Sequence, residues 1–92
     1  METIQGLDEI MTRLASLESG QSVQLILLYS SLKDVSAAKR VLEQAGLVVV
    51  KRFRYVPGLA VNGPAALWQT FLPKASPRPA AVYWDETVQA LE

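Results

Sequence analysis

Apolar residues recur at two spacings along the chain, and these spacings predict its secondary structure. Steps of three and four residues are typical of amphipathic helices, whereas β-branched and alternating runs are typical of strands. Glycine and proline mark the breaks between the periodic segments. The predicted elements are, in order, a helix over 3–18, a strand over 22–29, a helix that begins at Ser31 or Asp34 and ends at Gly46, strands over 47–56 and 59–62, a short helix after Pro64 and a strand over 80–84.

After the first helix, the predicted order is strand, helix, strand, strand, helix, strand. This order suits an α+β, ferredoxin-like βαββαβ fold, in which an antiparallel four-stranded sheet carries two helices on one face. Right-handed crossovers place both of these helices on the same side. We therefore divide the chain into an N-terminal helical extension, 1–21, and a domain, 22–92, whose last residues, 85–92, form a tail.

The strand over 22–29 is apolar on both of its faces. Val23, Leu25 and Leu27 alternate with Ile26 and Leu28, so that each set points to a different side of the sheet. A strand of this kind is either covered on both faces or awaits a partner. The second face, which also takes Val48 and Val50, is left to the first helix, to solvent or to another molecule.

Composition narrows the classes of function. The chain of 92 residues has neither Cys nor His, and its nine basic residues balance nine acidic ones. Disulfides and thiolate chemistry are therefore excluded, and the commonest general base and metal ligand is missing. No nucleophile–base set is recognisable around Ser30, Ser31 and Lys33. We expect no enzyme activity, no cofactor and no metal site.

Charge and hydropathy also bear on partners and location. Zero net charge gives no reason to expect nucleic acid or a membrane surface as partner. The longest apolar run, over 25–29, is far shorter than the about 20 residues that cross a bilayer. The start of the chain lacks the pattern of a signal peptide. We expect a cytoplasmic protein if Met1 is native, and a secreted or periplasmic one if a signal was removed.

Four segments, in order, carry a resemblance to a known family. The helix Val35–Gly46 ends in glycine, and Val49–Val56 alternates basic and aromatic residues. A turn into a strand follows at Pro57–Val61, and Ala81–Glu86 is a last strand with an acidic end. Together they resemble the propeptide and propeptide-like inhibitor domains of subtilisin-type serine proteases. The first helix precedes this region, and the loop over 73–79 is richer in proline than is usual there.

The resemblance implies an inhibitor of a subtilisin-like serine protease, which also acts as a folding chaperone in some members of the family. In the family, the sheet face away from the helices lies on two surface helices of the protease. The resemblance then gives Asp85 and Glu86 the role of capping the N-termini of those helices, which carboxylates favour. The alternative is that both are ordinary solvated charges at a strand end.

The resemblance also implies that the tail runs into the active-site cleft as an added strand. The family's targets favour apolar residues just before the scissile bond and at the fourth position back. Placing Leu91 before the bond puts Val88 at the fourth position, with Gln89 and Ala90 between them and Glu92 beyond. Sliding by one residue would bury charged Glu92 instead, at a cost in desolvation. A functionless chain end is the alternative.

Two other classes of function stay open. Lys51, Arg52 and Arg54 interleave with Phe53 and Tyr55, as in a nucleic-acid-binding sheet. The simpler interpretation is that alternation places the two aromatics in the core and the basic residues outside. The second class is a ferredoxin-like regulatory or oligomerisation module, in which the N-terminal helix pairs two copies.

Overall fold

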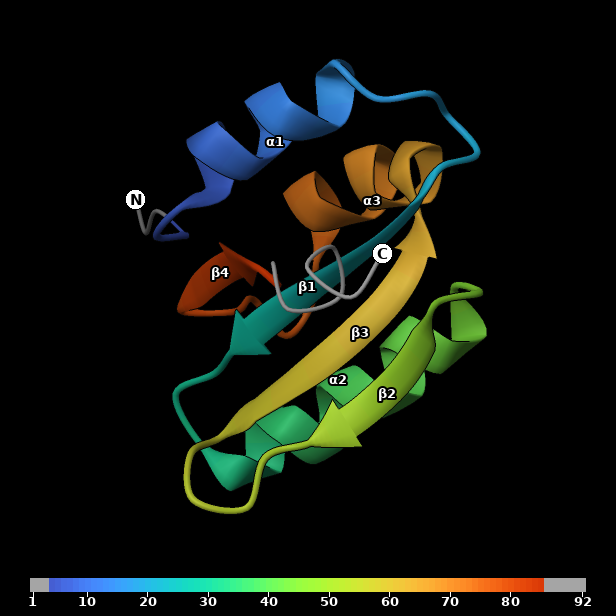
Figure 1. Cartoon of the computed structure of the whole chain (residues 1–92). Coiled ribbons are helices and arrows are strands. Elements are labelled where there is room, and N and C mark those ends of the chain that lie inside the picture. Colours follow the sequence, from blue (N-terminus) through green and yellow to red (C-terminus); the bar gives the residue numbers. More distant parts are fainter. Residues whose placement is uncertain (1–3, 86–92) are drawn as a thin grey trace.

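The structure is a computed structural model, and it describes residues 4–85. Three α-helices, a short 3₁₀ helix and four strands alternate along this range (Figure 1). In chain order they are α1 (Leu7–Ala15), β1 (Ser22–Leu28), α2 (Leu32–Gln44), β2 (Val48–Arg52), β3 (Gly58–Pro64), α3 (Ala65–Phe71), η1 (Leu72–Lys74) and β4 (Ala81–Trp84).

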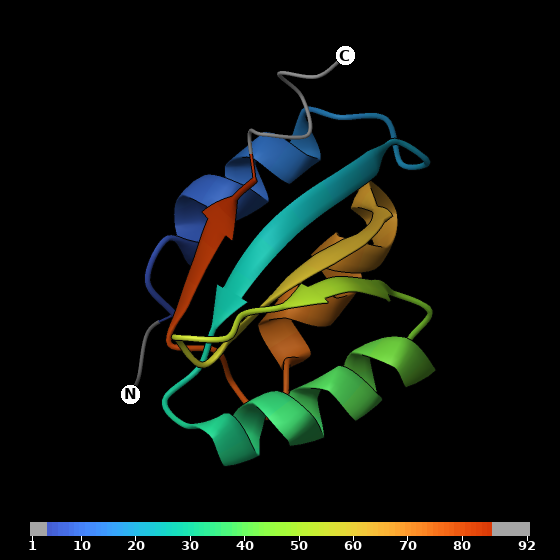
Figure 2. The ribbon, with the colours of Figure 1, turned by 60° about the horizontal axis from the view of Figure 1, so that its bottom comes forward.

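The four strands form one antiparallel sheet in the order β2-β3-β1-β4. This order confirms the predicted α+β fold with ferredoxin-like strand order. The central strands β1 and β3 pair over their whole length, from Ser22 opposite Pro64 to Leu28 opposite Gly58. Figure 2 shows α1 behind β4 and α3 behind β3, with α2 on the same side of the sheet. All three helices therefore belong to one layer.

The core lies between this helix layer and the sheet. Val23, Leu25 and Leu27 of β1 are buried, in alternation with half-buried neighbours. Opposite them, Trp68 of α3 is fully buried, and its indole Nε1 donates a hydrogen bond of 3.0 Å to the carbonyl oxygen of Val23. A buried indole N–H needs such a partner. Trp68 thus ties α3 to the central strand by both packing and a hydrogen bond.

Helix α2 begins and ends where the sequence predicts. Ser31 precedes the helix, and its hydroxyl oxygen accepts a hydrogen bond of 3.2 Å from the backbone N–H of Asp34. This is the usual N-cap arrangement, so that Ser31, rather than Asp34, is the cap. Gly46 follows the helix with φ +98°, a conformation that glycine adopts without strain.

Helix α1 is shorter than predicted, although the apolar period continues beyond both of its ends. Gln5 is extended and forms a parallel bridge with Ala81 at the outer edge of β4, so that the helix cannot begin before Leu7. Ile10 and Leu14 are buried in the same core as the sheet. Because α1 packs against α3 and β4, it lies in the helix layer and does not cover the second face of the sheet.

Gly6 joins this extended segment to α1 in a place that only glycine fits. Its φ is +82°, and an added Cβ would lie 2.5 Å from the carbonyl oxygen of Val82. We expect Gly6→Ala to lower the free energy of unfolding by about 1–3 kcal/mol, because it adds both a backbone strain and a clash. Urea denaturation checks this. Gly20→Ala is the control, since a Cβ there meets nothing within 4 Å; an equal loss in both variants would contradict the expectation.

Strand β2 is shorter than predicted, and its pairing with β3 contains a shift in register. Val49 lies opposite Val61, but Lys51 lies opposite Ala60, so that Val50 is the extra residue of a bulge. A one-residue shift exchanges the faces of all residues that follow. The simpler interpretation of the basic–aromatic alternation is therefore wrong. Tyr55 is 92% exposed and Phe53 only half-buried, and neither is part of the core.

Candidate functional site

The side of the sheet opposite the helix layer is the candidate functional surface, and we call it the open face. Strand pairing decides which side chains it carries, since residues directly opposite each other share a face. The rows run from β4 across β1 and β3 to β2. The open face consists of Asp85, Gln24, Asn62 and Val48 in one row, Tyr83, Ile26, Ala60 and Lys51 in the next, and Ala81, Leu28 and Gly58 in the last.

The middle of the open face is apolar and in part exposed. Tyr83 is 44% exposed and Val48 61%, while Ile26 and Leu28 between them are half-buried. Val50, at the bulge, is 53% exposed. Neighbouring apolar side chains that stay in contact with water and are rimmed by polar groups are typical of an interaction surface. Within residues 4–85, no helix covers this face (Figure 1).

A polar pair defines one corner of the open face. The side-chain Nε2 of Gln24 donates a hydrogen bond of 2.7 Å to Oδ2 of Asp85. The backbone N–H of Asp85 donates one of 3.1 Å to the carbonyl oxygen of Gln24. These two bonds extend the pairing of β1 with β4 by one residue. They hold the carboxylate of Asp85 at the rim of the open face, next to the apolar centre.

The diagonally opposite corner is basic and aromatic. It consists of the end of β2 and the start of the loop that leads to β3, where residues Lys51–Val56 surround a hollow of about 460 Å³. Lys51 Nζ lies 5.9 Å from the centre of the Phe53 ring, and Arg52 Nη2 donates a hydrogen bond of 3.1 Å to the hydroxyl of Ser36 on α2. Tyr55 projects into solvent. We call this segment the basic loop.

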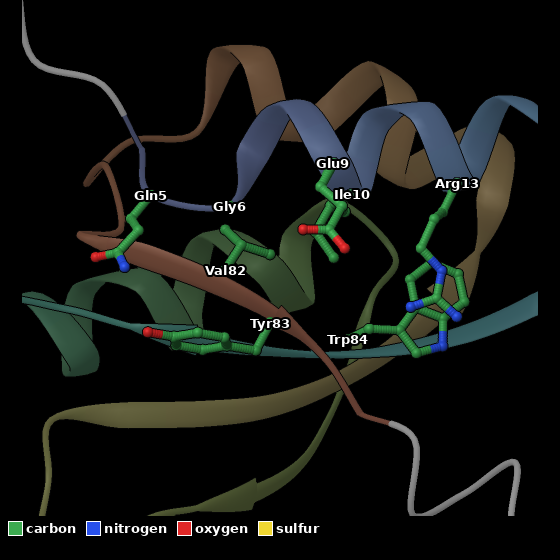
Figure 3. Close-up of a pocket in the computed structure, with 8 residues that line it drawn as sticks. All are labelled: Gln5, Gly6, Glu9, Ile10, Arg13, Val82, Tyr83 and Trp84. Atoms are coloured by element: carbon green, nitrogen blue, oxygen red, sulfur yellow. The ribbon is translucent and has the colours of Figure 1, made fainter.

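A second groove, of about 470 Å³, lies between α1 and the outer edge of β4. Figure 3 shows α1 on one side of it and Val82 to Trp84 on the other, while the Tyr83 ring lies on the far side of the strand. The guanidinium carbon of Arg13 is 4.0 Å from the centre of the Trp84 ring, a favourable cation–π contact. This contact fixes α1 against the end of β4 and closes one end of the groove.

Metal-ligating side chains do not gather in the part of the chain that the structure describes. Over residues 4–85, no three Asp, Glu, His or Cys side chains could hold a metal ion together. Burial, aided by the nearby charge of Asp34, raises the pKa of the Tyr29 hydroxyl well above its ordinary value of 10.0. Tyr29 is thus neutral and part of the core. None of the helices in this range is both long and apolar enough to cross a membrane.

The structure describes some of the predicted site residues and not others. Asp85 lies at the rim of the predicted face, and Ile26, Leu28 and Val48 belong to that face. Sequence reasoning missed Gln24, which positions Asp85. Its signal was a polar residue inside the otherwise apolar run Val23–Leu28. The remaining predicted contacts lie outside the described residues, namely Glu86 and the tail residues Val88, Gln89, Ala90, Leu91 and Glu92.

Comparison with known proteins adds no identification, because no protein-family model matches the chain and no curated protein matches it significantly.

Proposed function

We propose that the protein is an inhibitor of a subtilisin-like serine protease, and that it docks on the protease through its open face. The observation that carries the proposal is an exposed apolar sheet surface with a carboxylate held at its rim. The carboxylate of Asp85 accepts a hydrogen bond from the side chain of Gln24. This pair lies in the row next to that of Ile26 and Tyr83. The resemblance of the sequence to propeptide-like inhibitors supplies the class of target.

Helices of a partner fit this surface for a physical reason. A flat sheet face offers non-directional apolar contact along several strands, and half-buried Ile26 and Leu28 lie at its middle. Exposed Val48 and Tyr83 extend the contact to both edge strands. A carboxylate at the rim can accept hydrogen bonds from the unpaired N–H groups at a helix N-terminus. Asp85 would supply this polar contact.

The tail that follows Asp85 would block the active site. Once the open face is docked, the tail is tethered beside the cleft, so that its rebinding becomes intramolecular. In the preferred register, Leu91 lies before the scissile bond and Val88 fills the pocket at the fourth position. The same docked surface would favour the folded form of a cognate protease by mass action, which is the basis of a chaperone role.

Titration of a subtilisin-type protease with the purified protein tests the proposal. We expect activity to fall to near zero at equimolar inhibitor. A chain truncated after Asp85 keeps the open face but lacks the tail, and we expect its inhibition constant to be raised by about 10²-fold or more. Circular dichroism of the truncated chain controls for folding. Undiminished activity with a tenfold excess of the intact protein, across several such proteases, would refute the proposal.

A further inference from the structure

The open face carries opposite charges at its two diagonal corners. Asp85 directly follows β4, beside the end of β1 where Gln24 pairs with Asn62. Lys51 lies on the opposite edge strand, β2, one row nearer the other end of the sheet. The basic loop continues from Lys51 beyond that end. The apolar rows therefore separate one acidic corner from one basic corner.

The positive charge of the basic loop is not neutralised within the described chain. Over residues 4–85, no carboxylate lies within ion-pair distance of Lys51, Arg52 or Arg54. Arg52 is engaged with the neutral hydroxyl of Ser36, which fixes one wall of the loop. Lys51 and Arg54 are both exposed. Three like charges within four residues repel one another unless an anion joins them.

The loop is also shaped to receive a ligand. Its hollow of about 460 Å³ is lined only by Lys51–Val56. Phe53 lies between the cations, and Tyr55 follows the last of them. Tyr55 is 92% exposed, although a large aromatic side chain gains free energy when it is covered. Tyrosine and arginine are the residue types most enriched where protein partners bind strongly. The hollow thus combines charge, hydrogen-bond donors and uncovered apolar surface.

We propose that the basic loop is a second contact site, which takes an acidic segment on the surface of the protein partner. This inference rests on the proposed function, because it assigns the loop to the same docking event as the open face. The two corners then determine the orientation of docking. Asp85 meets the positive end of a helix, and the basic loop meets carboxylates. A partner rotated by half a turn would bring like charges together at both corners.

A nucleic acid fits the same surface less well. Sheets that bind single strands stack bases on aromatic side chains, but the central strands of the open face present Ile26, Leu28 and Ala60. The ring of Phe53 is in contact with the ammonium group of Lys51, 5.9 Å from the ring centre. Asp85 at the far corner would repel a phosphate backbone. Zero net charge also removes the long-range attraction on which such binding depends.

The first arm of the test needs no protease. A hexaglutamate peptide is added to the isotope-labelled protein at low salt, and backbone amide signals are followed by NMR. We expect shifts concentrated in residues 51–56, which are lost in the double variant Lys51→Glu/Arg54→Glu. The control double variant, Arg40→Glu/Lys74→Glu, makes the same change in net charge on exposed residues of α2 and η1 and should keep the shifts. Absent or scattered shifts would overturn the inference, and so would tighter binding of oligouridylate at the same loop.

The second arm measures, by stopped flow, the rate at which the protein associates with a protease that it inhibits. We expect the Lys51→Glu/Arg54→Glu variant to associate about tenfold more slowly at low salt, with a smaller difference at high salt. The control variant should differ less than about twofold. Equal rates in both variants, with inhibition intact, would refute the loop contact and leave the proposed function standing. Hexaglutamate binding at residues 51–56 without any protease inhibition would refute the proposed function and leave the basic loop as a site for acidic segments.

Discussion

Ile26→Glu is expected to abolish protease inhibition while leaving the protein folded. Ile26 lies at the middle of the open face, between Tyr83 on β4 and Ala60 on β3. In the free protein its half-buried side chain reaches water, so that a glutamate there stays solvated. In the docked complex that carboxylate would be buried without a partner. We expect the inhibition constant to rise by about 10²-fold or more, since each 1.4 kcal/mol is a factor of ten.

Two further variants make this result specific. Gln44→Glu makes the same change in charge on an exposed position of α2, in the helix layer, and is expected to inhibit like the unaltered protein. Ile26→Thr keeps the β-branch that suits a strand, and should weaken inhibition by an intermediate factor. Thermal unfolding of all three controls for folding. Equal inhibition by Ile26→Glu and Gln44→Glu would exclude the open face as the docking surface.

Trp68→Ala is expected to turn the inhibitor into a substrate. The indole is fully buried and hydrogen-bonded to Val23, so that its removal leaves a cavity and breaks this hydrogen bond. Such changes cost about 3–5 kcal/mol, against a total stability of about 5–10 kcal/mol for a domain of this size. The variant would populate unfolded chains that a protease cleaves. Urea denaturation and the rate of proteolysis measure the two effects.

Trp68→Phe separates packing from the hydrogen bond. It retains most of the apolar bulk but not the N–H donor, and we expect it to lose about 1–3 kcal/mol. This variant should resist proteolysis and still inhibit. If Trp68→Ala were as stable as Trp68→Phe, the indole would not be the main tie between α3 and the sheet.

The parts of the fold that follow from local chemistry were predictable from the sequence. Ser31 and Gly46 limit α2 because capping depends on a hydroxyl and on a positive φ at single positions. The alternation within β1 correctly separated Val23, Leu25 and Leu27 from Ile26 and Leu28. The strand order followed from the sequence of elements and from the right-handed crossover rule.

The parts that depend on contacts distant in sequence were not predictable. The bulge at Val50 exchanges the faces of β2, so that alternation alone placed Phe53 on the wrong side. The position of α1 in the helix layer depends on its contacts with α3 and β4, which its own periodicity does not contain. The polar corner of the candidate site was not predictable either, because the hydrogen bond from Gln24 to Asp85 joins residues that are far apart in the chain.

The central claim, that the open face is the docking surface, is tested most directly by transferred cross-saturation NMR. The protease would carry an alanine in place of its catalytic serine, and the inhibitor's methyl groups would be observed. We expect the strongest saturation at Ile26, Leu28 and Val48. Strongest saturation at Ala37 of α2 and Ala66 of α3, exposed residues of the helix layer, would contradict it.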